Sequence, residues 1–293
     1  MKIDFTDRVA IVTGAGGGLG RAHALALAAR GARVLVNDLG AGAAQAVVDE
    51  IVAAGGEAIA NTASVTDAEA VLAMVARAVA AWGRVDILVN NAGILRDKSF
   101  AKMSADDFKA VIDVHLMGAF HCTQAVWPLM VAQKYGRIVM TTSSSGLYGN
   151  FGQANYGAAK MALVGLMQTL SLEGAKHGIH VNCLAPTAAT RMTEGLLPPA
   201  VLAVLKPEAV TPALLWLVSA EAPTRAIACA GAGTFEAAHI TLTQGLHLGL
   251  DADTPEQVAA AWGQISERTG EQVPASGAAQ GSNEVGQALA AKP

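Results

Sequence analysis

A tyrosine and a lysine four residues apart are candidates for proton transfer in this chain. The segment Tyr156-Gly157-Ala158-Ala159-Lys160 opens a helical pattern, and residues at i and i+4 share one face of a helix. A cation beside a phenol stabilises the phenolate and lowers the tyrosine pKa from its usual value of about 10. Tyr156 is therefore a candidate acid or base, with Lys160 as its activator. An ordinary exposed helix pair has the same spacing.

Three adjacent serines precede this tyrosine. Ser143, Ser144 and Ser145 follow an apolar segment at the expected end of a strand, which is where ligands bind in open α/β sheets. A hydroxyl there could hold a substrate carbonyl oxygen. We expect Ser143 to do so, although chemistry alone does not separate the three hydroxyls.

A glycine-rich segment near the N-terminus is a candidate phosphate site. Residues Thr13-Gly14-Ala15-Gly16-Gly17-Gly18-Leu19-Gly20 join a short apolar segment to a helical one. Such a turn lets the backbone approach a pyrophosphate, and the helix N-terminus offers N–H groups and the positive end of the dipole. A tight turn is the alternative, but the position between a strand and a helix favours a dinucleotide site.

Asp38 indicates which dinucleotide would bind. It ends the second expected strand, 18 residues after Gly20. Its carboxylate could accept hydrogen bonds from the adenosine ribose and would repel a 2′-phosphate. No Arg or Lys follows it closely. This favours NAD over NADP, against the alternative of a solvated aspartate at a turn.

Short apolar segments alternate with longer Ala-rich ones and would position these residues. The expected strands are Arg8–Thr13, Arg33–Asp38, Glu57–Asn61, Val85–Asn90, Gly136–Thr142 and Ile179–Leu184. The expected helices are Leu19–Arg30, Ala41–Ala54, Asp67–Trp82, about Ser104–Gln133 and Asn155–His177. Strands that are apolar on both faces and separated by helices indicate a parallel sheet covered on both sides. We expect an α/β fold, a single doubly wound, Rossmann-type domain of about seven mainly parallel strands.

Two later segments differ from this pattern. Residues 187–210, rich in Pro and Ala at their start, predict a mobile lid, with an amphipathic helix packed on the sheet as the alternative. From about Gly270 the composition shifts to Gly, Ser, Ala and Gln. We expect residues 1–250 to form the cofactor domain and residues 251–293 a C-terminal helix and a loosely ordered tail.

Composition narrows the class of protein. There are 20 Lys and Arg against 24 Asp and Glu, a net charge of −4, which argues against nucleic acid as a partner. No stretch is long and apolar enough for a membrane span, and the N-terminus does not read as a signal peptide. The three cysteines have no CxxC spacing. We expect a cytoplasmic protein without a metal site.

Four motifs, in order and at the same spacing, resemble those of the short-chain dehydrogenase/reductase superfamily over roughly residues 5–245. They are Thr13–Gly20, Asn90-Asn91-Ala92-Gly93, Ser143 and Tyr156–Lys160. The resemblance implies an oxidoreductase that moves a hydride between NAD and a secondary alcohol or ketone. It implies that Ser143 orients the substrate oxygen, that Tyr156 transfers the proton, and that Lys160 lowers the tyrosine pKa and bonds the nicotinamide ribose.

The resemblance also implies the positions that contact the cofactor. They are Gly14, Gly16, Gly17, Gly18, Leu19, Gly20, Asp38, Ser64, Val65, Asn91, Ala92, Gly93, Tyr156, Lys160, Pro186 and Thr187.

One position departs from the superfamily pattern. Where the superfamily usually carries an asparagine in its long helix, this chain reads Val114-His115-Leu116-Met117-Gly118. His115 could join a proton relay through water, because imidazole both donates and accepts. It could equally be a structural histidine bonded to the backbone.

Longer stretches resemble one branch of the superfamily, the (3R)-hydroxyacyl-CoA dehydrogenase units of type 2 peroxisomal multifunctional enzymes, also called 17β-hydroxysteroid dehydrogenases. They cover residues 93–100, 114–120, 134–141 and 146–156. The resemblance implies an acyl-CoA substrate, and a 17β-hydroxysteroid or a steroid side-chain CoA thioester is the alternative. Arg96, Lys98 and Arg191 are candidate contacts for CoA, or ordinary solvated charges. For a steroid, the candidate cover is Met192, Leu196, Leu197, Val201, Leu202 and Leu205.

Two further expectations concern assembly and activity. The resemblance, together with the Ala- and Met-rich long helices Ser104–Gln133 and Asn155–His177, implies a homodimer or homotetramer. A catalytically idle NAD-binding sensor on the same fold is the alternative from another functional class. The presence of Ser143, Tyr156 and Lys160 together favours an enzyme.

Overall fold

The computed structural model describes residues 2–189 and 198–291 of the chain. It separates two compact units, Met1–Ala237 and Ala238–Pro293. The candidate site residues all lie in the larger unit.

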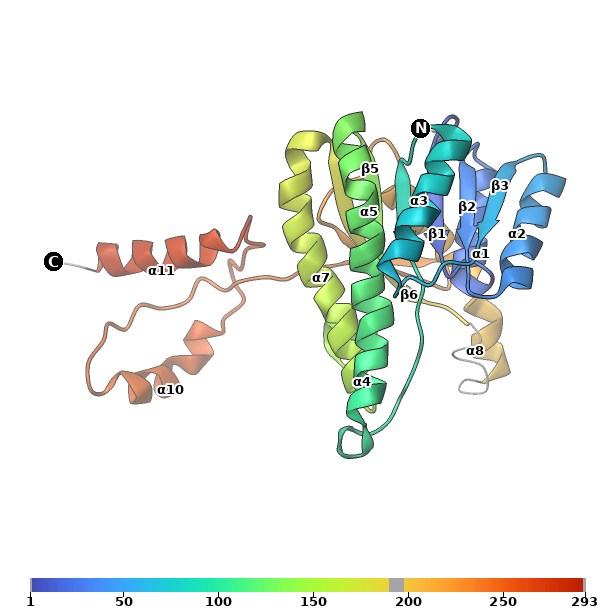
Figure 1. Ribbon diagram of the computed structural model, residues 1–293. Helices are drawn as coiled ribbons and strands as arrows, with labels where there is room; N and C mark the ends of the chain where they lie inside the picture. The colour runs from blue at the N-terminus through green and yellow to red at the C-terminus, as the bar shows by residue number, and fades with distance from the viewer. Residues whose placement is uncertain (1, 190–197, 292–293) are drawn as a thin grey trace. The chain divides into compact units, whose positions relative to one another are not determined.

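One eight-stranded sheet with helices on both faces forms the larger unit (Figure 1). Its strands are β1 (Val9–Thr13), β2 (Arg33–Asn37), β3 (Glu57–Asn61), β4 (Ile87–Asn90), β5 (Gly136–Thr141), β6 (Ile179–Thr187), β7 (Ile227–Gly231) and β8 (Thr234–Ala238). Their order across the sheet is β3-β2-β1-β4-β5-β6-β7-β8, and strands β1 to β7 pair in parallel. The predicted doubly wound α/β fold is confirmed.

The eighth strand exceeds the predicted number of about seven. β8 follows β7 after only two residues, Ala232 and Gly233, whose φ angles are 50° and 78°. Two positive φ values are the geometry of a tight hairpin turn, which returns the chain antiparallel. This hairpin was not predicted because its sequence is rich in Ala and Gly and lacks the alternation of polar and apolar residues that marks a strand.

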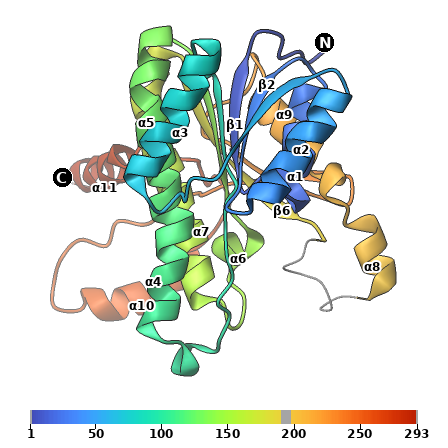
Figure 2. The same ribbon diagram turned by 45° about the vertical axis from the view of Figure 1, so that its right-hand side comes forward.

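The helices predicted from the sequence are present with close bounds, with one exception, and two short helices, at Ser144–Tyr148 and Thr211–Leu217, were not predicted. In the larger unit the helices are α1 (Gly18–Ala28), α2 (Ala41–Ala53), α3 (Ala68–Trp82), α4 (Ala105–Ile112), α5 (Gly118–Gln133), α6 (Ser144–Tyr148), α7 (Ala154–Gly174), α8 (Pro199–Val204) and α9 (Thr211–Leu217). Short 3₁₀ turns lie at Phe100–Lys102, Ala175–His177 and Pro207–Ala209. Helices α3, α5 and α7 cover one face of the sheet, and α1, α2 and α9 cover the other (Figure 2).

The exception is the long helix predicted over Ser104–Gln133. It consists of α4 and α5 joined by a π-helical segment, Asp113–Met117. A π-helical segment of this kind accommodates extra backbone in its turn and re-aims the side chains that follow. His115 lies in the middle of this segment and is buried.

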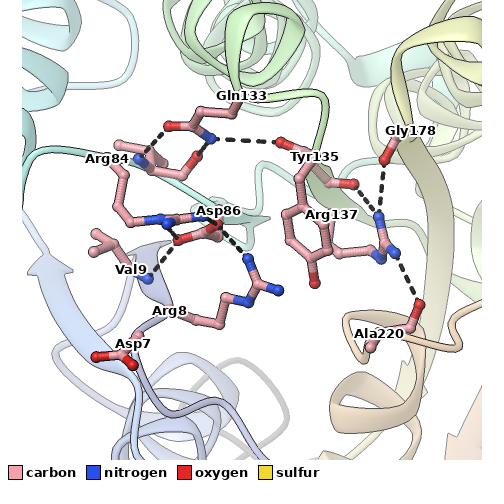
Figure 3. A network of polar contacts seen from close by, with 12 residues as sticks. Asp7, Arg8, Val9, Arg84, Asp86, Gln133, Tyr135, Arg137, Gly178 and Ala220 are labelled. Atoms are coloured by element: carbon pink, nitrogen blue, oxygen red, sulfur yellow. Dashed lines mark hydrogen bonds and ion pairs between the residues drawn. The ribbon is translucent and has the colours of Figure 1, made fainter.

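A polar network fixes the edge of the sheet opposite the site (Figure 3). The fully buried carboxylate of Asp86, next to β4, accepts hydrogen bonds from Arg8 at 3.0 Å and from Arg84 at 2.8 and 2.6 Å. The ring of Tyr135 is contacted by the guanidinium groups of Arg8 and Arg137, at 3.9 and 4.3 Å from its centroid. The network ties the starts of β1, β4 and β5 together, at the end of the sheet opposite the carboxyl ends of the strands.

The expected lid is described only in part. Residues 190–197, and with them Arg191, Met192, Leu196 and Leu197, lie outside the described residues. The remainder includes α8 and the turn Pro207–Ala209. Leu205 is buried, and its carbonyl accepts a hydrogen bond from the N–H of Ala189 at 2.6 Å.

The smaller unit holds α10 (Thr254–Ile265) and α11 (Ala278–Ala290). A single antiparallel bridge joins Leu242 to Gln272. Both helices lie within residues 251–293, where a C-terminal helix and a loosely ordered tail were expected, and the Ala and Gln residues of α11 favour a helix. Of the described helices, none is both long and apolar enough to cross a membrane.

Candidate active site

A cavity of about 300 Å³ at the carboxyl ends of the strands gathers the predicted catalytic residues. Ser143, Tyr156, Lys160 and His115 all line it. So do the predicted cofactor positions Leu19, Asn91, Gly93, Pro186 and Thr187. A larger cavity of about 540 Å³ between α9 and the β7–β8 hairpin contains none of these residues. The smaller cavity is therefore the candidate active site.

Helix α7 presents Tyr156 and Lys160 one turn apart. The Lys160 Nζ lies 5.4 Å from the centroid of the Tyr156 ring and donates a hydrogen bond to the Thr141 carbonyl at 2.5 Å. Lys160 is only 3% exposed, and burial lowers its pKa to about 7. Near neutral pH this side chain can exist as ammonium or as amine.

The pKa of Tyr156 is raised, whereas the spacing to Lys160 led us to expect a lowered value. Burial is the main cause of the rise; a hydrogen bond with Ser143 opposes it, and the charge of Asp97 adds to it. The expectation was wrong because spacing reveals a neighbouring cation but not the burial of both groups. Burial disfavours the phenolate and the ammonium alike.

The hydrogen bonds of the serines distinguish Ser143 from its neighbours. The Ser143 Oγ accepts a hydrogen bond from the N–H of Ser145 at 3.2 Å and so caps α6. The hydroxyl of Ser145 donates instead to the Oε1 of Gln153 at 2.7 Å. Ser143 hydrogen-bonds with Tyr156, as noted above, while Ser144 is exposed. This arrangement favours Ser143 as the hydroxyl that faces the substrate.

His115 packs between the loop after β4 and Tyr156. Its Nε2 lies 2.8 Å from the carbonyl oxygen and 3.0 Å from the N–H of Ile94, so it can donate to one or accept from the other. Its ring meets that of Tyr156 edge-on, with centroids 5.2 Å apart. Burial, with a smaller contribution from Lys160, lowers the His115 pKa to about 3. The contact with Ile94 supports the structural alternative, and the relay stays a hypothesis.

The glycine loop approaches the loop after β4 closely. Gly14 has a φ of +61°, and a Cβ there would lie 2.8 Å from the Cα of Ala92. Helix α1 then starts at Gly18, and its N-cap, Gly17, has no side-chain cap. No side chain at the N-cap occupies the first N–H groups of α1, and such groups at a helix start can bind an anion such as pyrophosphate.

Asp38 lies directly beside this loop. Its Oδ2 accepts a hydrogen bond from the N–H of Gly16 at 3.0 Å, and its Oδ1 accepts one from the N–H of Gly40 at 2.9 Å. Each carboxylate oxygen keeps a second lone pair that can accept a ribose hydroxyl. The position therefore fits the predicted dinucleotide site.

Asn91 joins the two loops that form the floor of the site. Its Nδ2 donates to the carbonyl oxygens of Thr13 and Gly14, both at 3.0 Å. The backbone N–H groups of Asn91 and Ala92 donate to the Thr13 Oγ1 at 3.0 and 3.1 Å. The predicted role of residues 91–93 as backing for the cofactor is consistent with this position.

Ser64 and Val65 follow β3 at the same edge of the sheet. The Ser64 Oγ lies 2.8 Å from the Thr66 Oγ1, and the Val65 carbonyl lies 3.0 Å from the Nδ1 of His121. Val65 lines a small polar cavity with Thr13 and Ala92. Both residues thus lie in a loop that can border the adenosine end.

Three residues without a predicted role also shape the site. Asn155 is fully buried, and its Nδ2 donates to the carbonyls of Arg96 and Asp107 at 3.0 and 3.3 Å. Asp97 and Gln153 line the cavity and hydrogen-bond to each other at 2.7 Å. All three residues lie in the stretches 93–100 and 146–156, which carry the family resemblance. A resemblance in sequence does not reveal which side chains contact one another.

Of the basic candidates for a CoA contact, Arg96 and Lys98 are not among the residues that line the cavity, and Arg191 lies outside the described residues. Lys98 forms an ion pair with Asp107 at 2.8 Å. Arg96 is exposed and donates to the carbonyl of Leu95 at 2.9 Å.

Comparison with known proteins places this geometry among dehydrogenases. The sequence model of a family described as short chain dehydrogenase matches residues 8–198. The chain is 51% identical over 225 residues to the peroxisomal hydratase-dehydrogenase-epimerase of Saccharomyces cerevisiae, covering 74% of this chain and 25% of that protein. It is 47% identical over 277 residues to the putative short-chain type dehydrogenase/reductase Rv0148 of Mycobacterium tuberculosis, covering 91% of this chain and 96% of that protein.

Two solved structures are similar. The full-length peroxisomal multifunctional enzyme type 2 of Drosophila melanogaster superimposes with a TM-score of 0.83 at 40% identity, over 98% of this chain and 50% of that chain. A 7α-hydroxysteroid dehydrogenase complexed with NADH and 7-oxo glycochenodeoxycholic acid gives a TM-score of 0.74 at 31% identity, over 78% of this chain and 95% of that chain.

Proposed function

The chain belongs to the short chain dehydrogenase family, and on this premise we propose that it oxidises a (3R)-3-hydroxyacyl-CoA thioester to the 3-ketoacyl-CoA with NAD. That it is an oxidoreductase follows from the family and its dehydrogenase relatives. The observation that carries the choice of substrate is the 51% identity to the yeast hydratase-dehydrogenase-epimerase. The chain spans only 25% of that protein's length, so the proposal concerns the dehydrogenation alone.

The choice of NAD rests on Asp38. A carboxylate beside the glycine loop can accept the ribose hydroxyls and repels a phosphate in the same place. The similar steroid dehydrogenase structure contains NADH, which supports the same choice. When bound, NAD supplies the acceptor for the hydride that leaves the carbinol carbon.

Three residues of the cavity have separate roles at the alcohol oxygen of the substrate and at the cofactor. The Ser143 hydroxyl donates a hydrogen bond to that oxygen and orients it. The Tyr156 phenolate, as general base, takes the proton of the alcohol as the ketone forms. Lys160 uses one N–H on the Thr141 carbonyl and keeps its remaining hydrogens for the nicotinamide ribose.

The second candidate substrate is a steroid alcohol. The similarity to the 7α-hydroxysteroid dehydrogenase favours it, but at 31% identity against 51% for the yeast relative. Leu205, which lines the cavity, provides apolar surface for either an acyl chain or a steroid.

The decisive assay is NAD reduction, followed by absorbance, with (3R)- and (3S)-hydroxyacyl-CoA thioesters and a 17β-hydroxysteroid in parallel. We expect turnover of the (3R) thioester. Turnover of the steroid alone would replace the acyl-CoA proposal with the second candidate. Absence of turnover with all three, despite NAD binding, would support an idle sensor.

We further propose that the chain forms a homodimer or homotetramer through α5 and α7. An apolar groove of about 250 Å³ lies between these helices and is lined by residues that include Phe120, Trp127, Leu166 and Leu170. Phe120 is 37% exposed, as expected for a side chain that a partner subunit covers. Light scattering that finds a monomer at micromolar concentration would exclude this assembly.

A further inference from the structure

A series of hydrogen bonds links Asp97, an exposed residue of the cavity lining, to Ser143. The Gln153 Nε2 donates to the Asp97 Oδ2 at 2.7 Å. The Gln153 Oε1 accepts from the Ser145 Oγ at 2.7 Å and from the Asn150 Nδ2 at 3.1 Å. The N–H of Ser145 donates to the Ser143 Oγ at 3.2 Å. All five side chains line the cavity that contains Tyr156.

The carboxylate sets the direction of this series of hydrogen bonds. An ionised carboxyl group only accepts hydrogen bonds, so the amide of Gln153 must turn its NH₂ group toward Asp97. The Gln153 Oε1 then faces Ser145 and Asn150, and the Ser145 hydroxyl donates its proton to this oxygen. Without the carboxylate, the amide could turn over and release that proton.

The last hydrogen bond of the series leaves one donor for the substrate. Because the Ser143 oxygen already accepts the N–H of Ser145, the hydroxyl can donate its one proton either to the Tyr156 oxygen or, in its place, to the substrate oxygen. Ser145, by contrast, is held away from the substrate by Gln153. Gln153 and Asp97 therefore determine which of the two hydroxyls, Ser143 or Ser145, donates to the substrate, although neither residue takes part in the transfer of the proton or the hydride.

From this arrangement we infer that Asp97 and Gln153 are positioning residues that keep Ser145 occupied and hold the Ser143 hydroxyl as the donor to the substrate oxygen. The inference rests on the proposed function of the cavity, and it assigns these two side chains a part in the rate of the reaction rather than in substrate affinity.

The charge of Asp97 provides a second readout. Tyr156 is faced by Lys160 on its own helix, by His115 from the π-helical segment, by Ser143 before α6 and by Asp97 after β4. Of these, Asp97 carries the negative charge, and it raises the Tyr156 pKa. Removing that charge should shift the rising limb of the pH–rate profile for oxidation to lower pH, because the base form of Tyr156 is the phenolate.

Two variants separate the effects. Asp97→Asn keeps the shape but removes the charge and the constraint on the amide. We expect kcat to fall roughly threefold, KM to change little, and the rising limb to move to lower pH. Gln153→Leu removes the hydrogen bonds between Asp97 and Ser145 but keeps the Asp97 charge. We expect kcat to fall about tenfold or more, since small misplacements of reacting groups are costly. The rising limb of the pH–rate profile should stay at the same pH.

Asp106→Asn is the matched control. Asp106 is an exposed carboxylate in the first turn of α4 and takes no part in these hydrogen bonds, so its neutralisation should change neither kcat nor the pH profile. Thermal unfolding of each variant verifies that it is folded. Wild-type kcat in Gln153→Leu, or an equal loss in Asp106→Asn, would overturn the inference.

A titration without substrate keeps this test apart from the proposed function. The tyrosinate absorbance of Tyr156, obtained by subtracting a Tyr156→Phe background, should show a lower pKa in Asp97→Asn than in the wild type. An unchanged pKa would overturn the part played by Asp97, whatever the substrate. A shifted pKa in a protein that turns over none of the thioesters or steroids would instead reject the proposed function.

Discussion

The imidazole of His115 occupies the space that any side chain on Gly93 would need. A Cβ at Gly93 would lie 2.3 Å from the His115 Cε1 and 3.1 Å from its Nδ1. Real atoms do not approach so closely, so one of the two residues must be small. The loop that backs the predicted cofactor site and the helix that carries His115 are therefore fitted to each other.

Gly93→Ala should displace His115 and destabilise the protein. Overpacking of this kind typically costs about 1–3 kcal/mol, which denaturant unfolding can measure. The double variant Gly93→Ala, His115→Ala should recover part of that loss, because residues in contact are not additive. Strict additivity of the two single effects would mean that the contact does not limit stability.

Tyr156→Phe should abolish turnover and leave NAD binding within about 1 kcal/mol. Only the phenolic oxygen is removed, and with it the group that accepts the proton. Steady-state rates and a fluorescence titration with NAD measure the two quantities. A comparable loss of NAD affinity would assign Tyr156 to binding rather than to proton transfer.

Lys160→Met should flatten the rise of stability with pH above neutrality. The pKa of Lys160 is about 7 in the folded chain against an ordinary 10.5. Between these values the unfolded chain holds a proton that the folded chain does not, so the free energy of unfolding increases with pH, by about 1 kcal/mol per pH unit. Below pH 7 the penalty for burying the ammonium is present in full.

Unfolding by denaturant at pH 7, 8 and 9 compares the two proteins. Other groups that titrate in this window are common to both, so the difference in slope reports Lys160. Parallel slopes would show that Lys160 keeps its ordinary pKa in the folded protein.

Asp38→Asn should relax the preference for NAD. The amide keeps the shape of the carboxylate but no longer repels a 2′-phosphate, so the ratio of kcat/KM for NAD to that for NADP should fall at least about tenfold. Asp49→Asn is the matched control, because Asp49 is an exposed carboxylate on α2 that hydrogen-bonds Gln45. Equal ratios in Asp38→Asn and the wild type would remove Asp38 from cofactor selection.

The sequence predicted most of the framework because local patterns determine it. Strands such as β3 and helices such as α2 came within a residue of their bounds, since apolar periodicity and flanking Gly mark them. Ser143, Tyr156 and Lys160 meet in one cavity because the topology brings the end of β5 to the start of α7. Motif order carries that information.

What the sequence did not reveal depends on burial and on contacts between distant segments. The direction of the Tyr156 pKa shift follows from burial, which spacing to Lys160 cannot show. The pairing of Asp97 with Gln153 joins two loops far apart in the chain, and no local pattern marks it. Similarly, a π-helical turn has no composition that distinguishes it from an α-helix.

The π-helical turn between Asp113 and Met117 makes the site depend on the exact number of residues in this segment. In an α-helix each residue advances the direction of the side chain by about 100°. Deleting one residue there would restore regular helical hydrogen bonds, yet it would turn either His115 away from Ile94 or the buried face of α5, with Cys122 and Val126, away from the sheet. Insertions and deletions at this point should therefore be rarer among functional descendants of the chain than substitutions, even though the segment lies within one long helix.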